Sequence, residues 1–327
     1  MKIVEKFYPK IEEAVKVLEP VIHRTPLKHS HLLSDITGAQ VYLKLENLQK
    51  TGSFKIRGAY YKLSRLSPRE RRDGVITASS GNHAQAVAYA AKVMGIPATV
   101  VMPVNASPIK VEACRGYGAE VIFHGEVWDD AHEESLKIAE RRRLTYVHPF
   151  NDPDIICGQG TLGAEIYEDL GDAEAAVVPI GGGGLVSGVA LALKKLNPRI
   201  HVFGVQPERA PSMKAALEAG KPVDTPVGDT MADGLAGRRT GDLTFKIVRA
   251  LVEDVATVSE EAIARAVILL LERCKTLVEP SGAASVAAII SGGLDLEGKK
   301  IVAVVSGGNV DLPLLAKIIE GGVMKTC

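Results

Sequence analysis

Ser53-Phe54-Lys55-Ile56-Arg57-Gly58 places a lysine at the start of a predicted helix, directly after the strand-like segment 41–44 and a short polar turn. A lysine beside a serine is usually a solvated surface residue, because lysine is seldom buried without a partner. At the positive end of a helix, and partly removed from water, the charged form of the amine is disfavoured. Lys55 is therefore a candidate nucleophile if the rest of the chain supplies a site around it.

A run of four glycines, Gly181-Gly182-Gly183-Gly184, lies more than a hundred residues downstream. It follows a predicted apolar strand at 175–180 and precedes a predicted helix at 185–193. Such a run can be only a tight turn, but it also leaves backbone N–H groups bare at a helix N-terminus. Bare N–H groups at this position bind anions, phosphate among them.

A dinucleotide-binding motif is the alternative interpretation of the glycine run. Its G-x-G-x-x-G spacing is not met, because Ser187 or Val186 stands where the third glycine belongs, depending on the starting glycine. Glu208 lies near the distance at which such proteins carry a ribose-binding acid, so a nicotinamide-dependent oxidoreductase stays open as a function. That interpretation does not explain Lys55.

Three further loops are also short, rich in small and polar residues, and placed beside predicted strands or helices. The segment 77–85 carries Ser79-Ser80-Gly81-Asn82-His83 between a predicted strand and a predicted helix, and its hydroxyls and amide suit a carboxylate. Ser306-Gly307-Gly308-Asn309 ends the apolar strand 301–305, at the edge where open α/β sheets bind ligands. Glu279-Pro280-Ser281-Gly282 places an acid before a helix of small residues. Each loop alone could be a helix cap, but their shared type and position indicate one common site.

Strands and helices alternate along the whole chain, which predicts an α/β fold with two parallel sheets and a cleft between them. The first series has strands at 74–79, 98–103, 119–124 and 145–148, separated by helices at 82–94, 107–116 and 128–143. The second has strands at 175–180, 200–206, 255–258 and 301–306, with helices that include 260–275 and 281–291.

Taken in chain order, these motifs resemble the pyridoxal-phosphate enzymes of fold type II, the tryptophan synthase β-like fold. They are most similar to threonine dehydratases (threonine ammonia-lyases) and serine racemases, over about residues 15 to 320. The resemblance implies a discontinuous large domain of residues 1–66 and 147–327, a small domain of residues 67–146, and an active site in the cleft between them. It also implies pyridoxal 5'-phosphate as the cofactor.

The resemblance assigns a role to each candidate residue. Lys55 would bind the cofactor as a Schiff base and act as the catalytic base, and Ser80 would face the substrate from the opposite side. Other cofactor-binding residues would be Phe54 against the pyridine ring, Asn82 at the ring's 3-oxygen, Gly181, Gly182, Gly183 and Gly184 at the phosphate, Ser306 at the pyridine nitrogen, and Glu279. Substrate-binding residues would be Ser79, Ser80, Gly81 and His83 at the carboxylate, and Gly234 near the side chain.

The reaction implied is a β-elimination that converts L-threonine to 2-oxobutyrate and ammonia, and L-serine to pyruvate and ammonia. A neutral hydroxyl at Ser306 need not protonate the pyridine nitrogen, and the weaker electron sink favours prompt loss of the β-hydroxyl. Racemisation, with Ser80 supplying the second proton, stays open on the same scaffold, as does β-replacement of the kind that makes cysteine or cystathionine. A non-catalytic vitamin-B6-binding protein is the alternative if Lys55 is misplaced.

No metal site is expected. Where serine racemases carry an acid that binds a divalent cation, this chain has Gln206, and Ser212 stands near a second acidic ligand. The four cysteines are scattered without C-x-x-C spacing, which argues against a zinc site or a disulfide scaffold and predicts buried reduced thiols. They are Cys114, Cys157, Cys274 and Cys327.

Composition is that of a compact enzyme. The 327 residues are 46% hydrophobic, and 39 basic residues balance 39 acidic ones, so nothing favours nucleic acid as a partner. The N-terminal residues include Lys2, Glu5 and Lys6 in place of an apolar signal core, and no apolar run reaches the roughly 18 to 20 residues of a membrane helix. We expect a cytoplasmic homodimer or homotetramer that acts on a small amino acid. The chain ends about twenty residues after the Ser306 loop, so no appended effector domain and no isoleucine feedback are expected.

Overall fold

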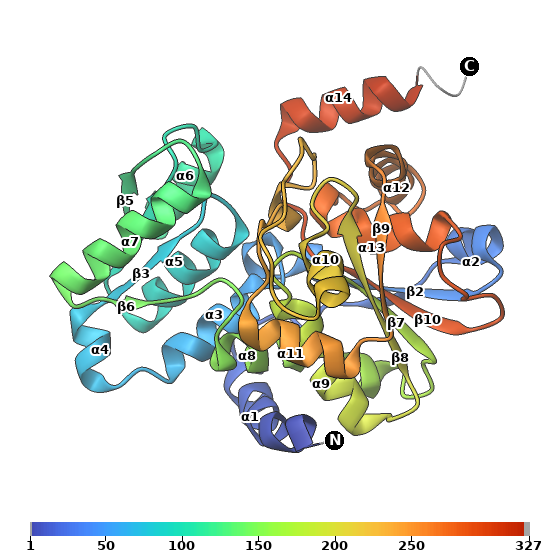
Figure 1. The fold of residues 1–327 in the computed structure, drawn as a ribbon, viewed down its shortest axis with the longest axis horizontal. Coiled ribbons are helices and arrows are strands. Elements are labelled where there is room, and N and C mark those ends of the chain that lie inside the picture. The colour runs from blue at the N-terminus through green and yellow to red at the C-terminus, as the bar shows by residue number, and fades with distance from the viewer. Residues whose placement is uncertain (1, 324–327) are drawn as a thin grey trace.

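The computed structural model describes residues 2–323, so Cys327 lies outside the described part of the chain. Its strands form two separate sheets, seen at the left and the right of Figure 1. The smaller sheet has the order β5-β4-β3-β6, and all of its pairings are parallel. Its strands are β3 (Val75–Ala78), β4 (Ala98–Met102), β5 (Glu120–Phe123) and β6 (Thr145–Tyr146), and its helices are α5 (Asn82–Met94), α6 (Pro108–Gly116) and α7 (Trp128–Arg142).

The larger sheet has six strands in the order β1-β2-β10-β7-β8-β9, parallel except where β1 meets β2. They are β1 (Leu27–His29), β2 (Gln40–Leu45), β7 (Ala175–Pro179), β8 (His201–Pro207), β9 (Asp254–Val258) and β10 (Lys300–Val305). The predicted α/β class with two parallel sheets is confirmed, and the antiparallel β1 is an addition to it.

Helices surround the larger sheet and link it to the smaller one. They are α1 (Lys2–Leu18), α2 (His31–Thr37), α3 (Lys55–Ser64), α4 (Pro68–Asp73), α8 (Pro153–Asp169), α9 (Gly184–Leu196), α10 (Ser212–Ala219), α11 (Asp242–Leu251), α12 (Glu260–Glu272), α13 (Pro280–Ile290) and α14 (Leu312–Val323). Short 3₁₀ turns are η1 (Glu46–Leu48), η2 (Lys50–Gly52) and η3 (Asp233–Leu235). Among the described residues, no helix combines the length and the apolar composition needed to cross a membrane.

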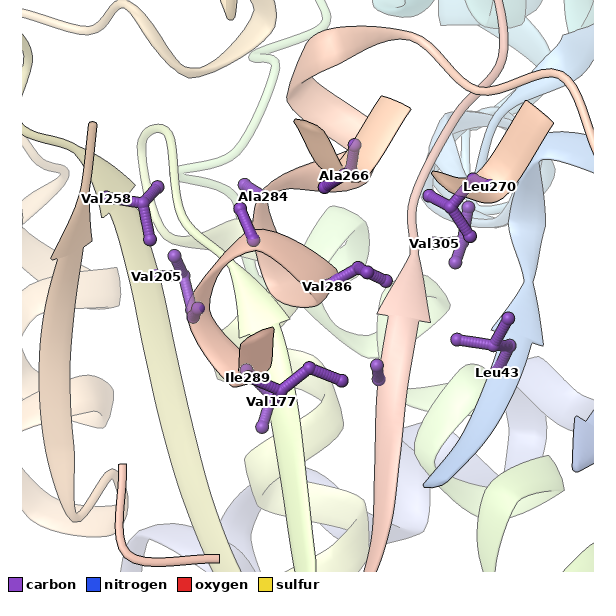
Figure 2. Close-up of a cluster of buried hydrophobic side chains, with 14 of the residues drawn as sticks. Leu43, Val177, Val205, Val258, Ala266, Leu270, Ala284, Val286, Ile289 and Val305 are labelled. Atoms are coloured by element: carbon purple, nitrogen blue, oxygen red, sulfur yellow. The ribbon is translucent and has the colours of Figure 1, made fainter. Parts of the chain in front are cut away.

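The central strands of the larger sheet are buried on both faces, which explains their nearly continuous apolar sequence. Every residue of β7 is buried. On one face, side chains of the sheet such as Val177, Val205 and Val305 pack against Val286 and Ile289 of α13 and against residues of α12 (Figure 2). On the other face, residues of α8 and α9 such as Leu162 and Val189 complete the core.

The N-terminal segment belongs to the larger sheet, because β2 pairs with β10 along its whole length, from Gln40 opposite Lys300 to Leu45 opposite Val305. The chain then builds the smaller sheet and returns to the larger one. This pairing agrees with a discontinuous large domain, although the boundaries at residues 66 and 146 stay a prediction.

Three helices approach one another so closely that only glycine fits between them. A Cβ on Gly158 of α8 would lie 2.5 Å from the carbonyl oxygen of Arg57 in α3. A Cβ on Gly188 of α9 would lie 2.4 Å from the carbonyl oxygen of Ile156 in α8. Because α3 begins at Lys55 and α9 begins at Gly184, this packing sets the position of the lysine relative to the glycine run.

Candidate active site

Lys55 is the first residue of α3, and its side chain is only partly exposed. Its Nζ donates a hydrogen bond to the carbonyl oxygen of Pro149 at 3.1 Å and lies 5.2 Å from the centroid of the Phe54 ring. Burial lowers the pKa of this amine to about 8, against the opposing charge of Glu279. A substantial neutral fraction is therefore present near physiological pH, as the sequence suggested.

An ion-pair cluster holds the first turn of α3, where Arg57 stands two residues after Lys55. Arg57 is fully buried and bonds Glu46 through Nε at 2.8 Å and Glu165 through Nη1 at 2.7 Å. Removing one member would leave a buried charge unpaired, which is strongly destabilising. No local pattern assigns a role to these residues, because the partners of Arg57 lie 11 and 108 positions away in the chain.

The glycine run connects β7 to α9, and Gly183 has a φ of +94° that favours glycine. A Cβ on Gly182 would lie 2.4 Å from the ring of Phe150, and one on Gly183 would lie 2.8 Å from Met213. Thr244 of α11 donates a hydrogen bond to the carbonyl oxygen of Gly182 at 2.7 Å. The run is therefore held as bare backbone at the N-terminus of a 13-residue helix, which is a suitable cradle for a phosphate.

Asn82, Glu279 and Asn309 form a hydrogen-bonded chain between the two sheets. Asn82 Nδ2 donates to Glu279 Oε1 at 2.6 Å, and Asn309 Nδ2 donates to Asn82 Oδ1 at 2.7 Å. Asn82 Nδ2 has two hydrogens, so one remains for a further acceptor. A Cβ on Gly307 would lie 2.3 Å from Glu279 Oε1 and 3.2 Å from Asn82 Nδ2. The Ser306 loop therefore packs against the bonded pair of Asn82 and Glu279.

Glu279 is a buried carboxyl group whose pKa is raised to about 7. Burial is the main cause and the negative charge of Asp233 adds to it, while the hydrogen bond from Asn82 and the charge of Lys110 oppose it. The group therefore gains or loses a proton in the physiological range, next to the candidate lysine.

Ser306 directly follows β10 and is buried. Its carbonyl oxygen accepts a hydrogen bond from the backbone N–H of Phe54 at 3.1 Å, and Ser53 forms an isolated β-bridge with Gly307. Two loops separated by about 250 residues in sequence are thus joined directly. Phe54, which makes one of these contacts, is the residue before Lys55. The fully buried Ser53 hydroxyl has no hydrogen-bond partner in the described structure.

The loop that carries Ser79, Ser80 and Gly81 lies between β3 and α5, and all three residues are partly exposed. A Cβ on Gly81 would meet no atom within 4 Å, so there is space beside this loop. His83 is different, because it is buried and its Nε2 donates to the carbonyl oxygen of Val147 at 3.1 Å. Burial, followed by the charge of Lys55, lowers the pKa of His83 to about 3 and keeps it neutral.

Gly234 lies in η3, where its N–H donates to the hydroxyl of Ser281 at 2.9 Å. Its carbonyl oxygen is only 3.0 Å from the position of a Cβ on Gly181. The structure therefore brings Gly234 to the glycine run and to the Glu279 loop. The specific contacts predicted between the candidate residues and a substrate or cofactor stay predictions.

Residues 147–151, which we call the crossover segment, belong to the site although no sequence motif marks them. Pro149 accepts the bond from Lys55, Phe150 covers Gly182, and Asn151 Oδ1 accepts a hydrogen bond from the backbone N–H of Leu243 at 3.0 Å. The only signal in the sequence was the end of a predicted strand at residue 148, because nothing local marks these residues as functional.

Gln206 is fully buried and caps the start of α10. Its Oε1 accepts hydrogen bonds from the backbone N–H groups of Met213 at 2.9 Å and Lys214 at 3.1 Å, and its Nε2 lies 3.4 Å from the Ser212 hydroxyl. The absence of a metal here stays a prediction. The expectation for the thiols holds for Cys114 and Cys157, which are buried and free, but Cys274 is only half-buried.

Comparison with known proteins connects this geometry to a family. A family model described as "Pyridoxal-phosphate dependent enzyme" matches residues 18–307. The chain belongs to this family. The resemblance drawn from the motifs is thereby confirmed, and pyridoxal phosphate is the cofactor of the family.

Two named relatives cover almost the whole chain. The chain is 51% identical over 316 residues to an L-threonine ammonia-lyase of Thermotoga maritima. The match covers 97% of this chain and 79% of the relative. It is 45% identical over 317 residues to a catabolic L-threonine dehydratase of Staphylococcus aureus. This match covers 96% of this chain and 92% of the relative.

Solved structures agree with the fold. The processed threonine deaminase isoform 2 of Solanum lycopersicum matches with a TM-score of 0.93 and 37% identity, over 98% of this chain and 93% of that one. Maize serine racemase matches with a TM-score of 0.91 and 39% identity, over 97% of this chain and 98% of that one. The fold predicted from the resemblance, type II of the pyridoxal-phosphate enzymes, is confirmed.

The residues present fit pyridoxal phosphate. Lys55 offers an amine with a lowered pKa, the glycine run is a cradle that side chains would fill, and Asn82 keeps a free N–H donor. An aldehyde, a phosphate and a ring oxygen are the groups that such donors bind.

Proposed function

We propose that this protein dehydrates and deaminates L-threonine to 2-oxobutyrate and ammonia, and L-serine to pyruvate and ammonia. The observation that carries the proposal is the 51% identity, over 97% of the chain, to a relative named L-threonine ammonia-lyase. The site geometry supports it, because a partly buried amine, a phosphate cradle and an open serine loop are brought together from distant parts of the chain.

Lys55 is the proposed attachment residue for the cofactor and the proposed base. With a pKa of about 8, about a tenth of this amine is neutral at pH 7, against roughly one part in three thousand for an ordinary lysine. Pyridoxal phosphate, when bound, withdraws electrons from the substrate's Cα–H bond. Lys55 Nζ then takes up the Cα proton, for which it must be in its neutral form.

The other cofactor contacts are proposed from the family resemblance, and the meeting of the loops supports them. The N–H groups of Gly181, Gly182, Gly183 and Gly184 would hold the phosphate, with Asn82 at the ring oxygen, Phe54 against the ring, Ser306 at the ring nitrogen and Glu279 beside Asn82. A neutral hydroxyl at Ser306 need not protonate the ring nitrogen, so the ring accepts electrons less strongly than it would beside an acid. This favours loss of the β-hydroxyl over slower side reactions.

The substrate is proposed to lie beside the loop of Ser79, Ser80 and Gly81, where the structure has space. The hydroxyls and backbone N–H groups of this loop would bind the carboxylate, with Ser80 on the face opposite Lys55. His83 would contribute mainly through the loop, since its Nε2 is already bonded to Val147. Gly234 would lie near the substrate side chain.

We further propose the domain division into residues 1–66 with 147–327 and residues 67–146, supported by the pairing of β2 with β10. A cytoplasmic homodimer or homotetramer is proposed from the family resemblance. Light scattering of the purified protein would test the oligomeric state, and cell fractionation would test the location.

The activity is tested directly by incubating the protein and pyridoxal phosphate with L-threonine and measuring 2-oxobutyrate and ammonia. Equal amounts of both products are expected, with pyruvate and ammonia from L-serine. A protein that binds the cofactor but releases neither product from either amino acid would contradict the proposal.

Serine racemisation is a second candidate activity. The match to maize serine racemase at a TM-score of 0.91 favours it, together with the position of Ser80 in an open loop. Chiral chromatography after incubation with L-serine would detect D-serine, and its absence under conditions that give pyruvate would rule the activity out.

A further inference from the structure

The crossover segment is the place where the chain passes from the smaller sheet to α8. Each of its ends is held by hydrogen bonds. Val147 O accepts hydrogen bonds from the Thr77 hydroxyl at 2.9 Å and from His83 Nε2 at 3.1 Å. At the other end, Asn151 Oδ1 accepts the bond from Leu243 N, close to the start of α11.

The middle of the segment touches both parts of the proposed cofactor site. The carbonyl oxygen of Pro149 accepts the hydrogen bond from Lys55 Nζ. The Phe150 ring covers Gly182, and the Phe150 backbone lies against Gly184, where a Cβ would come within 3.0 Å of it. A small change in this turn would therefore move the amine's partner and one wall of the cradle together.

His148 is the residue that holds the turn from inside. Its Nδ1 accepts hydrogen bonds from the backbone N–H groups of Phe150 at 3.2 Å and Asn151 at 2.9 Å. Its ring packs against the Phe150 ring, with 4.6 Å between centroids and 88° between planes. Pro149 has no N–H to contribute, so these two bonds are the ones that close the turn.

The ring can accept these bonds only while Nδ1 carries no proton. Burial lowers the pKa of His148 to about 4, as do the charges of His132 and Lys55, while Asp152 opposes them. The rings of Tyr146 and His132 lie 6.1 and 6.5 Å away. The acceptor form therefore persists through the physiological range.

We propose that His148 is a positioning residue, which acts through the crossover segment to hold the Pro149 carbonyl at Lys55 and the Phe150 ring on the glycine run. The inference rests on the proposed cofactor roles of Lys55 and the glycine run. Nothing in the family resemblance or the motif pattern assigns this residue a task.

Two substitutions separate the acceptor from the ring. His148→Asn keeps an acceptor at the same distance from the backbone and removes the ring, and asparagine readily bonds the backbone two residues ahead. His148→Phe keeps a ring and removes the acceptor, which leaves two backbone N–H groups unpaired. His201→Phe is the matched control, because His201 is a half-exposed histidine at the start of β8, outside the crossover segment.

The apo form of each protein is titrated with pyridoxal phosphate by equilibrium dialysis, and kcat and KM are then measured on L-threonine. His148→Phe should bind the cofactor at least about tenfold more weakly and lose kcat, while His148→Asn should stay within about threefold of the parent in both. The control should be unchanged.

Equal binding by the parent and His148→Phe would overturn the inference, and so would a loss in His148→Asn as large as that in His148→Phe. Should His148→Phe fail to fold, the smaller His148→Ala takes its place, because it also removes the acceptor, and binding equal to that of the parent would again overturn the inference. Failure of the parent itself to bind pyridoxal phosphate would instead contradict the proposed function.

Discussion

The amine of Lys55 donates its hydrogen bond to the carbonyl oxygen of Pro149, a residue 94 positions further along the chain. The bond joins the start of α3 to the crossover segment, and through Phe150 it connects the lysine to the glycine run. A reactive amine and an anion cradle are thus positioned by one short piece of backbone.

Lys55→Ala should reduce turnover of L-threonine by several orders of magnitude, because attachment and proton transfer are lost together. Borohydride reduction followed by peptide mapping should place the pyridoxyl group on Lys55. Lys44 and Lys110 serve as internal controls, since Lys44 Nζ already bonds Thr25 O and Glu165, and Lys110 pairs with Asp233. Label on either of them would contradict the assignment.

The rate at which added pyridoxal phosphate labels the apo form should rise as the pH passes through about 8, because only the neutral Lys55 amine reacts. The measurement is borohydride-trapped label on the Lys55 peptide between pH 6 and 10. An inflection near the ordinary lysine value of about 10.4 would show that burial does not lower the pKa of this amine.

Glu279→Gln should stabilise the apo form above pH 7 and make little difference near pH 4. The folded-state pKa of Glu279 is raised from 4.5 to about 7, so the folded protein binds more protons than the unfolded chain between these values and loses stability as the pH rises through them. Glutamine lacks this cost and keeps an oxygen for Asn82. The difference at pH 8 should be on the order of 3 kcal/mol in denaturant unfolding, and an equal effect at both pH values would refute the explanation.

Gly183→Ala should weaken cofactor binding, because the new methyl group would press on Met213 and Thr244 and move the cradle. Gly95→Ala is the matched control, since Gly95 also has a positive φ, of +66°, but has no atom within 4 Å of the added Cβ. Both variants place alanine in the left-handed conformation, which costs about 1–2 kcal/mol. Only Gly183→Ala should lose affinity for pyridoxal phosphate in equilibrium dialysis; equal affinities would indicate that the run is only a turn.

Ser80→Ala should separate dehydration from racemisation. Lys55 alone is sufficient to take a proton from an L-amino acid, so pyruvate formation from L-serine should survive, weakened by changed carboxylate binding. Formation of D-serine needs a proton on the other face and should fall by at least about tenfold. The observable is the ratio of D-serine to pyruvate, measured for parent and variant together. An unchanged ratio would assign Ser80 to the carboxylate loop alone.

Much of the fold follows from local pattern. Apolar runs such as 175–179 and 301–305 become parallel strands because both faces of the sheet are covered by helices. The loops after these strands carry the candidate residues, since ligands of open α/β sheets bind at the carboxyl ends of strands. The strand that local pattern missed is β1, which is only three residues long.

Residue order and residue type therefore account for the strands, the helices, the lysine at the start of α3 and the bare glycines before α9. The environment of those residues depends on packing between segments that are remote in the chain. Arg57 between Glu46 and Glu165, Pro149 at Lys55 and Phe150 on Gly182 are contacts of this kind. A pKa is shifted by burial and by neighbouring charge, and both exist only once the two sheets and the crossover segment have come together.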